Sequence, residues 1–381
     1  MTTLPASAAD QYLRGHLPGL DGIRGLAILL VMTVHFIGGA VAETPLQKFF
    51  VKAAVHGWMG VDLFFVLSGF LITGILLGSK NKPRYFRNFY ARRALRIFPL
   101  YYVVLIALFL ILPLLVKPSP LLEIARSHQI WLWTYTSNFF IAWTGTWDSL
   151  NYVAHFWSLA IEEHFYLVWP LVVFYFPAPT LKKICLGVIV FALALRIALA
   201  LADINETSIS VLTPCRIDAL CVGAFIALQL REPGVWPRWM ANSNYALLAF
   251  GAALFAVMAF ASFTGLAEAV LHQVRGTFIA LFFGALILLA LKPASNPVSY
   301  VLQGPHLGFF GKYSYGLYVY HGILTWYFME THLDDQLTAW SGSLWLAMAA
   351  RMLIGVGLSL LIAVPSYHLF EKRFLDLKRY F

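Results

Sequence analysis

The chain has 381 residues, of which 60% are hydrophobic, 16% aromatic and only 12% charged. This composition excludes an ordinary soluble protein and predicts an all-α, polytopic membrane protein. The net charge of +9 does not indicate nucleic-acid binding, because the placement of Lys and Arg along a membrane protein sets its topology. Three cysteines lack metal-ligand spacing, so we expect buried apolar side chains and no metal site: Cys185, Cys215 and Cys221.

Residues 1–19 are polar and are expected to form a cytoplasmic tail before the first predicted span, residues 20–42. This span can cross a bilayer as a helix, yet it contains Arg24 near one end and His35 beyond its middle. Their spacing places both side chains on one helical face, about 16 Å apart. An ionisable side chain at membrane depth costs about 3 kcal/mol or more unless it faces protein or water, so this face is expected to line a polar interior. Alternatively, Arg24 snorkels to the lipid headgroups and His35 is structural.

The second predicted span, residues 58–78, leads into the most basic segment of the chain. Residues 80–96 contain seven Lys or Arg side chains and no Asp or Glu. The positive-inside rule places such a segment in the cytoplasm. The first span therefore starts inside, with Arg24 near the cytoplasmic surface and His35 in the outer half of the membrane.

Eight further spans are predicted from apolar runs of suitable length. The connection at 117–156 includes an aromatic stretch, residues 131–143, which is too short and too polar for a span and is expected to be interfacial or re-entrant. We therefore predict one transmembrane domain of about ten helices over residues 20–370, with both termini inside and a basic cytoplasmic tail at 371–381. The eight spans are residues 97–116, 157–176, 184–202, 216–230, 244–263, 274–291, 313–330 and 344–369.

The polar side chains of these spans are expected to form one path across the helix bundle, because isolated charges would each need separate compensation. The predicted topology places these side chains at three depths. Arg24, Arg93 and Arg96 are expected at the inner surface, and Ser68 and His321 near the middle of the membrane. The outer half is expected to contain His35, Asp62, His155, Glu162 and Glu163.

The start of the fourth span, HFWSLAIEEHFY at residues 155–166, places His155, Ser158, Glu162 and Tyr166 on one helical face. A histidine with a carboxylate in a water-poor site suits a general base for acyl transfer to a hydroxyl. It equally suits a proton relay in a transporter. Either Glu162 or Glu163 could instead pair with a buried arginine, and the candidates for this are Arg196, Arg216 and Arg275.

The basic segment places Arg92, Arg93 and Arg96 on about one side of a helix, with aromatic residues between them. Arginine binds phosphate bidentately and stacks on planar rings, which suits a phosphorylated adenine nucleotide such as coenzyme A. The alternative is a run that sets topology or contacts anionic lipid.

Six motifs of this sequence occur in the order seen in one family, and the chain resembles the acyltransferase 3 family of bacterial membrane O-acyltransferases. The resemblance begins at about residue 17 and continues to the end of the chain. The motifs are Arg24 with His35, GVDLFFVLSGFLI (60–72), RALR (93–96), HFWSLAIEEHFY (155–166), RIDALCVGAFIA (216–227) and YSYGLYVYHG (313–322).

The resemblance implies transfer of an acyl group, usually acetyl, from cytoplasmic coenzyme A to a hydroxyl of a carbohydrate-containing acceptor. In this family His35 matches the catalytic base or transient acyl carrier, and Arg24 an essential charge near the donor. Arg93 and Arg96 match the arginine pair credited with donor binding. A further polar element is matched by Trp157, Ser158 and Glu162 or Glu163. Many members carry an extra span and a periplasmic SGNH-type hydrolase domain, and we expect no such second transfer step here.

The working hypothesis assigns the remaining polar side chains to this reaction. Glu162, Glu163 or Asp62 would orient His35, and an acyl-His35 or acyl-Ser68 relay is a variant. Arg92 would join the donor site. The candidates for stabilising the oxyanion are Arg24, Ser158 and Trp157. Substrate contacts are expected from Trp157, Ser158, Asp62, Ser68 and His321, although His321 could equally be structural.

The predicted function is a multi-pass enzyme of the bacterial inner membrane that transfers an acetyl group from acetyl-coenzyme A to a cell-envelope or exported glycan. Its expected partners are membrane lipids, acyl-coenzyme A and the carbohydrate acceptor, without nucleic acid. Two alternatives stay open. One is an acyltransferase acting on a secondary metabolite such as a macrolide, and the other is a transporter or flippase using the same polar path.

Overall fold

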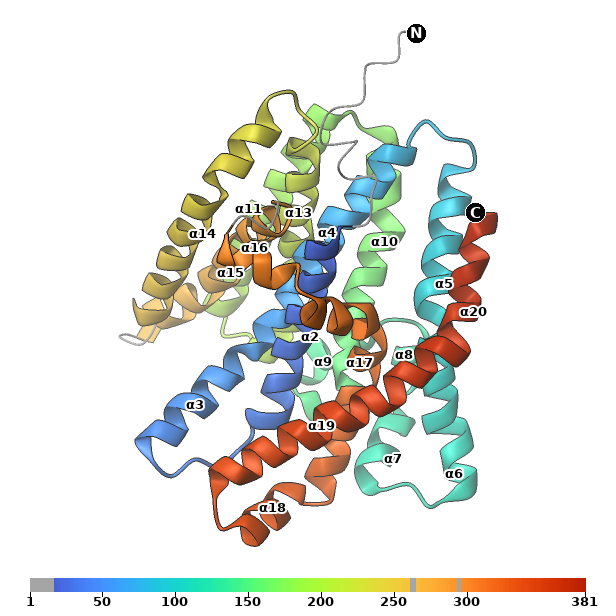
Figure 1. Cartoon of the computed structure of the whole chain (residues 1–381), viewed down its shortest axis with the longest axis vertical. Helices are drawn as coiled ribbons and strands as arrows, with labels where there is room; N and C mark the ends of the chain where they lie inside the picture. The colour runs from blue at the N-terminus through green and yellow to red at the C-terminus, as the bar shows by residue number, and fades with distance from the viewer. Residues whose placement is uncertain (1–16, 261–264, 293–295) are drawn as a thin grey trace. The chain divides into compact units, whose positions relative to one another are not determined.

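Helices account for the architecture, because a chain that meets lipid must satisfy its backbone N–H and C=O groups internally. The computed structural model describes residues 17–260, 265–292 and 296–381, and all regular elements within them are helices (Figure 1). In these residues, seven helices are long and apolar enough to cross a membrane. The predicted all-α, multi-pass membrane protein is therefore confirmed.

Within the described residues every predicted span falls on a helix, whereas residues 261–263 of the span 244–263 and residues 1–16 of the expected tail lie outside them. The seven apolar helices cover seven of the predictions: Pro18–Ile37, Pro45–Ser79, Tyr85–Leu115, Ala178–Leu201, Val235–Phe260, Glu268–Ala290 and Leu344–Tyr380. The other three predictions, 157–176, 216–230 and 313–330, fall on α10 (Trp157–Tyr175), α13 (Thr213–Gln229) and α17 (Pro305–Glu330). Helix α13 has only 17 residues, whereas α10 and α17 carry polar side chains such as Glu162, Glu163 and His321, which lower their hydropathy. The total of about ten spans and their orientation stay predictions.

Several predicted bounds differ from the helix ends in the structure by five residues or more, and two of these differences have a clear physical reason. Helix α2 (Pro18–Ile37) ends five residues before the predicted bound of 42, at the pair Gly38 and Gly39, since glycine favours helix ends. Helix α5 (Tyr85–Ile106) begins twelve residues before the predicted 97, because its basic first half gives no apolar signal. The arginines of this segment therefore lie on a helix that continues into the predicted span. The aromatic stretch 131–143 contains two short helices, α8 (Ile130–Trp133) and α9 (Ser137–Thr144), and its place at the membrane stays a prediction.

The chain divides into two compact units that alternate along the sequence. Unit 1 comprises Met1–Gly25, Asp62–Tyr85 and Ile161–Phe309, and unit 2 comprises Leu26–Val61, Phe86–Ala160 and Phe310–Phe381.

Unit 1 is built on helices that cross at close range. A Cβ atom at Gly69 of α4 (Met59–Ser79) would lie 1.8 Å from the carbonyl oxygen of Leu220. One at Gly223 of α13 would lie 1.9 Å from that of Val66. The two backbones therefore touch, as small residues allow between membrane helices. The remaining helices of unit 1 are α11 (Ala178–Leu201), α12 (Glu206–Val211), α14 (Val235–Phe260), α15 (Gly265–Ala290) and α16 (Pro297–Leu302), together with most of α10.

Unit 2 combines long helices with a group of short ones. Tyr315 of α17 donates a hydrogen bond of 2.6 Å to the carbonyl oxygen of Ile97, which joins α17 to α5. Phe36 of α2 packs in the space left by Gly355 of α19 (Leu344–Ser366). The short elements are α3 (Pro45–Val55), a π-helix at Ala107–Ile111, α6 (Leu112–Leu115), α7 (Pro120–Ser127), α8, α9, the 3-10 helices Trp147–Ser149 and Asn151–Phe156, α18 (Leu333–Ser341), the π-helix η5 (Tyr367–Glu371), α20 (Lys372–Asp376) and the 3-10 helix η6 (Leu377–Tyr380).

Candidate functional site

Three histidine rings meet inside unit 2, and we call them the histidine cluster: His35 of α2, His155 of the 3-10 helix before α10, and His321 of α17. The ring centroids of His35 and His321 lie 4.9 Å apart, and those of His155 and His321 lie 5.3 Å apart. His155 and His321 are buried, whereas His35 keeps some exposure. The structure therefore brings together two histidines predicted as site residues and adds His155 to them.

Each ring of the histidine cluster is oriented by a backbone carbonyl group. Nδ1 of His35 lies 2.7 Å from the Val31 oxygen, and Nδ1 of His321 lies 3.1 Å from the Leu317 oxygen. Nε2 of His155 lies 3.2 Å from the Val319 oxygen. A carbonyl oxygen only accepts hydrogen bonds, so each of these three nitrogens carries the proton.

The opposite ring nitrogens are then available as acceptors. In a neutral imidazole that donates through one nitrogen, the other bears the lone pair. For His35 this nitrogen is Nε2. The corresponding atoms of the other two rings, Nδ1 of His155 and Nε2 of His321, are buried and have no hydrogen-bond partner among the described residues. The backbone of this chain thus presents three imidazole lone pairs in one place, which is the form that a general base requires.

The packing around His155 explains how a third ring fits. A Cβ atom at Gly322 would lie 2.3 Å from Nδ1 of His155, so only glycine leaves room for the ring. The hydroxyl of Tyr318 donates a 2.7 Å bond to the carbonyl oxygen of His155, and it lies 2.5 Å from Oγ of Ser158. These contacts hold the start of α10 against α17. Ser158, a predicted substrate contact, therefore has a positioning partner in Tyr318.

Trp157, the neighbouring predicted site residue, is half-buried at the start of α10. Its ring centroid lies 5.9 Å from that of Trp147. The two indole planes are tilted by 54°, so they do not form one flat surface, and either ring could face a sugar or a membrane interface.

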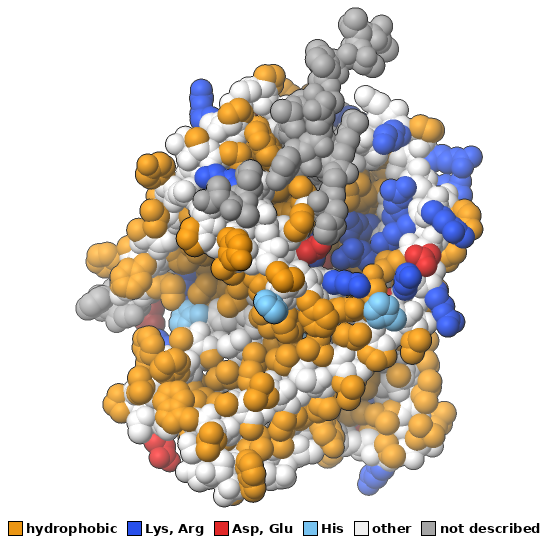
Figure 2. All heavy atoms as spheres, viewed as in Figure 1, with side chains coloured by type: hydrophobic (Ala, Val, Ile, Leu, Met, Phe, Trp, Pro, Cys, Tyr) orange, Lys and Arg blue, Asp and Glu red, His pale blue; other side chains and the backbone are white. Residues whose placement is uncertain are grey.

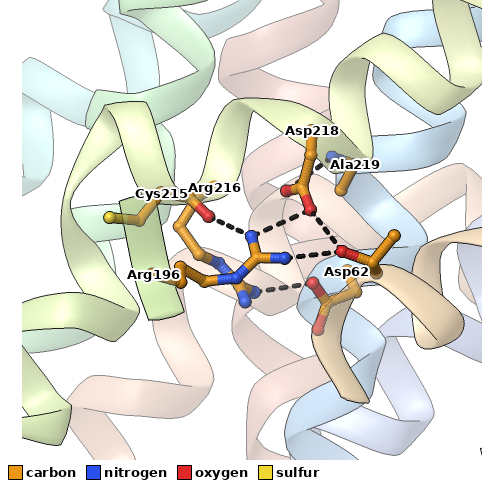
Figure 3. A network of polar contacts seen from close by, with 7 residues as sticks. Asp62, Arg196, Cys215, Arg216, Asp218 and Ala219 are labelled. Carbon is orange, nitrogen blue, oxygen red and sulfur yellow. Dashed lines mark hydrogen bonds and ion pairs between the residues drawn. The ribbon is translucent and has the colours of Figure 1, made fainter. Parts of the chain in front are cut away.

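Asp62 lies in a different environment, a buried network of unit 1 (Figure 3). Its Oδ1 atom accepts a 2.7 Å hydrogen bond from Arg216, while its Oδ2 atom is buried with no hydrogen-bond partner among the described residues. Arg196 donates to Asp218 at 2.8 Å and to the hydroxyl of Thr277 at 2.6 Å. Two arginines thus face two aspartates, which balances their charges at membrane depth. The structure pairs Arg216 with Asp62, and the pairing of Glu162 or Glu163 with a buried arginine stays a prediction.

The other predicted site residues of unit 1 lie on α2, α4 and α10. Arg24 forms an ion pair with Asp21, one turn earlier on α2. Ser68 and the hydroxyl of Tyr166 are hydrogen bonded, which joins α4 to α10. Glu162 and Glu163 are half-buried on α10. The Nδ1 atom of His35 has the Val31 carbonyl as its partner. A part for Glu162 or Glu163 in orienting His35 stays a prediction.

The predicted donor-binding arginines lie on the first half of α5. Arg92 and Arg96 are exposed, one helical turn apart, and Arg93 is half-buried beside them. Figure 2 shows that Lys and Arg side chains gather over α5 and α20. This surface offers several guanidinium groups to one anion, and guanidinium forks suit phosphate.

Sequence reasoning missed two kinds of site feature. Asp21 stands three positions before Arg24, the spacing of a helical ion pair, so this partner was visible in the sequence. His155 was noted as a polar residue of the predicted path but given no role of its own, and Tyr318 was not singled out. Their importance rests on contacts between residues more than 160 positions apart, for which the sequence carries no local signal. Among the described residues, no group of His, Cys, Asp and Glu side chains is placed to hold a metal ion.

Comparison with known proteins gives a family and several relatives. Residues 17–368 match the family model described as an acyltransferase domain. The chain is 28% identical over 331 residues to the peptidoglycan O-acetyltransferase of Listeria monocytogenes, a match covering 82% of this chain and 50% of that protein. A Bacillus subtilis protein named provisionally for the same activity is 28% identical over 326 residues, which are 80% of this chain and 48% of that protein.

A Staphylococcus aureus protein, provisionally named an O-acetyltransferase, is 25% identical over 381 residues, covering 94% of this chain and 57% of that protein. The chain therefore spans about half the length of the curated relatives it matches. No solved structure matches it.

Proposed function

Because the chain belongs to the acyltransferase 3 family, we propose that it transfers an acetyl group to a hydroxyl of a cell-envelope glycan. The names of the Listeria and Bacillus relatives support peptidoglycan as the acceptor class. The observation that carries the proposal is the histidine cluster, in which the proton on Nδ1 of His35 leaves the lone pair on Nε2.

In the proposed reaction His35 acts as the general base. Its Nε2 atom accepts the proton of the acceptor hydroxyl while that oxygen attacks the carbonyl carbon of the acyl thioester. The carbon–sulfur bond breaks, the acetyl ester forms, and the imidazolium returns the proton to the leaving thiolate. The Val31 carbonyl keeps the ring in the required tautomer throughout.

The proposed donor is acetyl-coenzyme A, bound from the cytoplasm of a bacterial inner membrane. Arg92, Arg93 and Arg96 would hold its phosphate groups, because a polyphosphate anion needs several guanidinium donors and these three lie on one half of a helix. The basic character of this segment also supports a cytoplasmic position for it. His35 lies farther along the predicted path, on the same helix as Arg24.

The test is donor binding and turnover by the full chain in lipid nanodiscs. We expect His35→Ala to bind acetyl-coenzyme A normally and to lose about a hundredfold or more in turnover, as removal of a general base does. The double variant Arg93→Ala/Arg96→Ala should lose binding. The matched control is His306→Ala, which removes an exposed histidine of α17 and should change neither quantity.

Two outcomes would contradict the proposal. Unchanged turnover in His35→Ala would remove the base from the mechanism while leaving the donor assignment in place. Failure of every variant and of the wild type to bind acetyl-coenzyme A would overturn the acyltransferase activity. Translocation of a lipid-linked sugar would then be the next measurement, because a transporter can use the same polar side chains.

A further inference from the structure

One atom of the histidine cluster is a buried acceptor that the proposed reaction does not use. The side chain of His321 is 0% exposed, and its Nε2 atom has no hydrogen-bond partner within the residues that the structure describes. A buried acceptor without a donor costs stability, so such an atom in a native protein is expected to have a functional reason.

The ring of His321 packs on the ring of the proposed base, His35. Their centroids lie 4.9 Å apart, and their planes meet at 78°. The two rings come from α17 and α2, and Nδ1 of each faces a carbonyl group four residues earlier on its own helix. Nε2 is the ring nitrogen farther from Cβ. Both lone pairs therefore lie at the outer ends of the two side chains, in the space where the helices face each other.

This pair of rings changes its interaction when a proton arrives. While both rings are neutral, their Nε2 atoms cannot hydrogen bond to each other, because each bears a lone pair and neither supplies a proton. When Nε2 of His35 captures the proton of the acceptor hydroxyl, the ring becomes an imidazolium with a new N–H group. That N–H group needs an acceptor, and the Nε2 lone pair of His321 supplies one.

The packing around His321 keeps its ring beside the base. The ring of Phe36 lies edge-on to it, with centroids 6.5 Å apart, and the ring of Tyr318 lies 5.4 Å away. His155 is placed differently, because its Nδ1 atom lies against the backbone of α17 at Gly322, 2.3 Å from where a Cβ atom would be. A ring fixed in advance loses little freedom when the charge forms, which favours stabilisation of that charge.

We propose that His321 is a positioning residue that stabilises the imidazolium of His35 between the two proton transfers of the reaction. The inference rests on the proposed function, in which His35 is the general base. The O–H bond of the acceptor breaks and the N–H bond of His35 forms. This N–H group donates to Nε2 of His321 until the proton passes to the leaving thiolate. A neutral ring does this without adding another charge at membrane depth.

The experiment measures coenzyme A release with peptidoglycan fragments as acceptor, acetyl-coenzyme A binding and thermal unfolding, all on the full chain in nanodiscs. His321→Phe keeps a planar ring and removes the lone pair, whereas His321→Gln supplies a carbonyl oxygen as acceptor. His306→Phe makes the first exchange at an exposed position of the same helix and is the control.

We expect His321→Phe to lose about tenfold to a hundredfold in turnover, as the loss of a hydrogen bond to a charged group does, while its donor binding is unchanged. His321→Gln should recover part of this loss, and His306→Phe should match the wild type.

A double variant separates a role through His35 from a purely structural one. If His321 acts through His35, the variant His35→Ala/His321→Phe should turn over as slowly as His35→Ala alone, because no imidazolium is left to stabilise. A packing defect would multiply with the loss from His35→Ala and would also lower the melting temperature.

The outcomes distinguish this inference from the proposed function. Wild-type turnover in His321→Phe would overturn the inference and leave the proposed function standing. Equal losses in His321→Phe and His321→Gln that multiply in the double variant would make His321 structural and overturn it as well. Unchanged turnover in His35→Ala, or no coenzyme A release by the wild type, would instead contradict the proposed function itself.

Discussion

A matched pair of glycines on α19 allows a test of the packing behind the histidine cluster. A Cβ atom at Gly355 would lie 2.7 Å from three carbons of the Phe36 ring, whereas one at Gly357 meets nothing within 4 Å. Carbon atoms pack best at about 3.5–4.0 Å, so Gly355→Ala must move the ring by about 1 Å. Phe36 is buried and next in sequence to His35, and its ring centroid lies 6.5 Å from that of His321.

The expected result is a loss of both stability and turnover. Overpacking of a tight core costs about 1–3 kcal/mol, so Gly355→Ala should lower the midpoint of thermal unfolding by several degrees. A displacement of about 1 Å at a catalytic group can also cost about a hundredfold in rate. Gly357→Ala should be neutral or slightly stabilising, because alanine favours a helix over glycine by about 0.5–1 kcal/mol.

The assay compares intrinsic fluorescence during heating and acetyl transfer for both variants in nanodiscs. Each substitution adds one methyl group to the same helix, so helix propensity and composition are matched. Equal melting curves and equal turnover for the two variants would refute the argument, since the predicted difference comes only from the contact between Gly355 and Phe36.

Three further predictions concern the two units separately. Asp62→Asn removes the carboxylate that pairs with Arg216 and should destabilise the protein by about 3–5 kcal/mol, whereas an apolar replacement of both residues should cost much less in a double-mutant cycle of unfolding. Tyr318→Phe removes the hydroxyl that holds the start of α10, and it should cost about 1 kcal/mol of stability and lower turnover without changing donor binding. The hydrogen bond from His272 lowers the pKa of Glu206 below its usual value of 4.5, so this contact stabilises the fold above that pH and is lost as the pH falls through the lowered pKa. The melting temperature of Glu206→Gln should therefore vary less than that of the wild type in this acidic range.

Hydropathy alone was enough to place the long helices, because lipid forces nearly every spanning residue to be apolar. The same signal failed where a helix is not apolar. The first half of α5 is basic, so its helical start at Tyr85 could not be told from a loop, although the arginine spacing already hinted at one helical side. Helix ends depend on small local features, and the Gly38–Gly39 pair ended α2 before its apolar run did.

The candidate site was predictable only in part, for a related reason. An ionisable residue in an apolar run is conspicuous, which singled out His35, Asp62 and the glutamates of α10. Which partner each finds depends on tertiary packing. Asp62 pairs with Arg216, which is 154 positions away, and nothing in the local sequence distinguishes that arginine from Arg196 or Arg275.

The rings of the histidine cluster are oriented by backbone carbonyl groups. The sequence suggested a carboxylate partner for His35, on the model of soluble enzymes, but a charge at membrane depth would itself need compensation. A carbonyl oxygen from the same helix fixes the tautomer equally well and adds no charge, as Val31 does for His35 and Leu317 does for His321. Each acceptor lies four residues before its histidine, so the helix itself supplies the orientation. One of the suggested carboxylates has a different partner, because Asp62 forms an ion pair with Arg216.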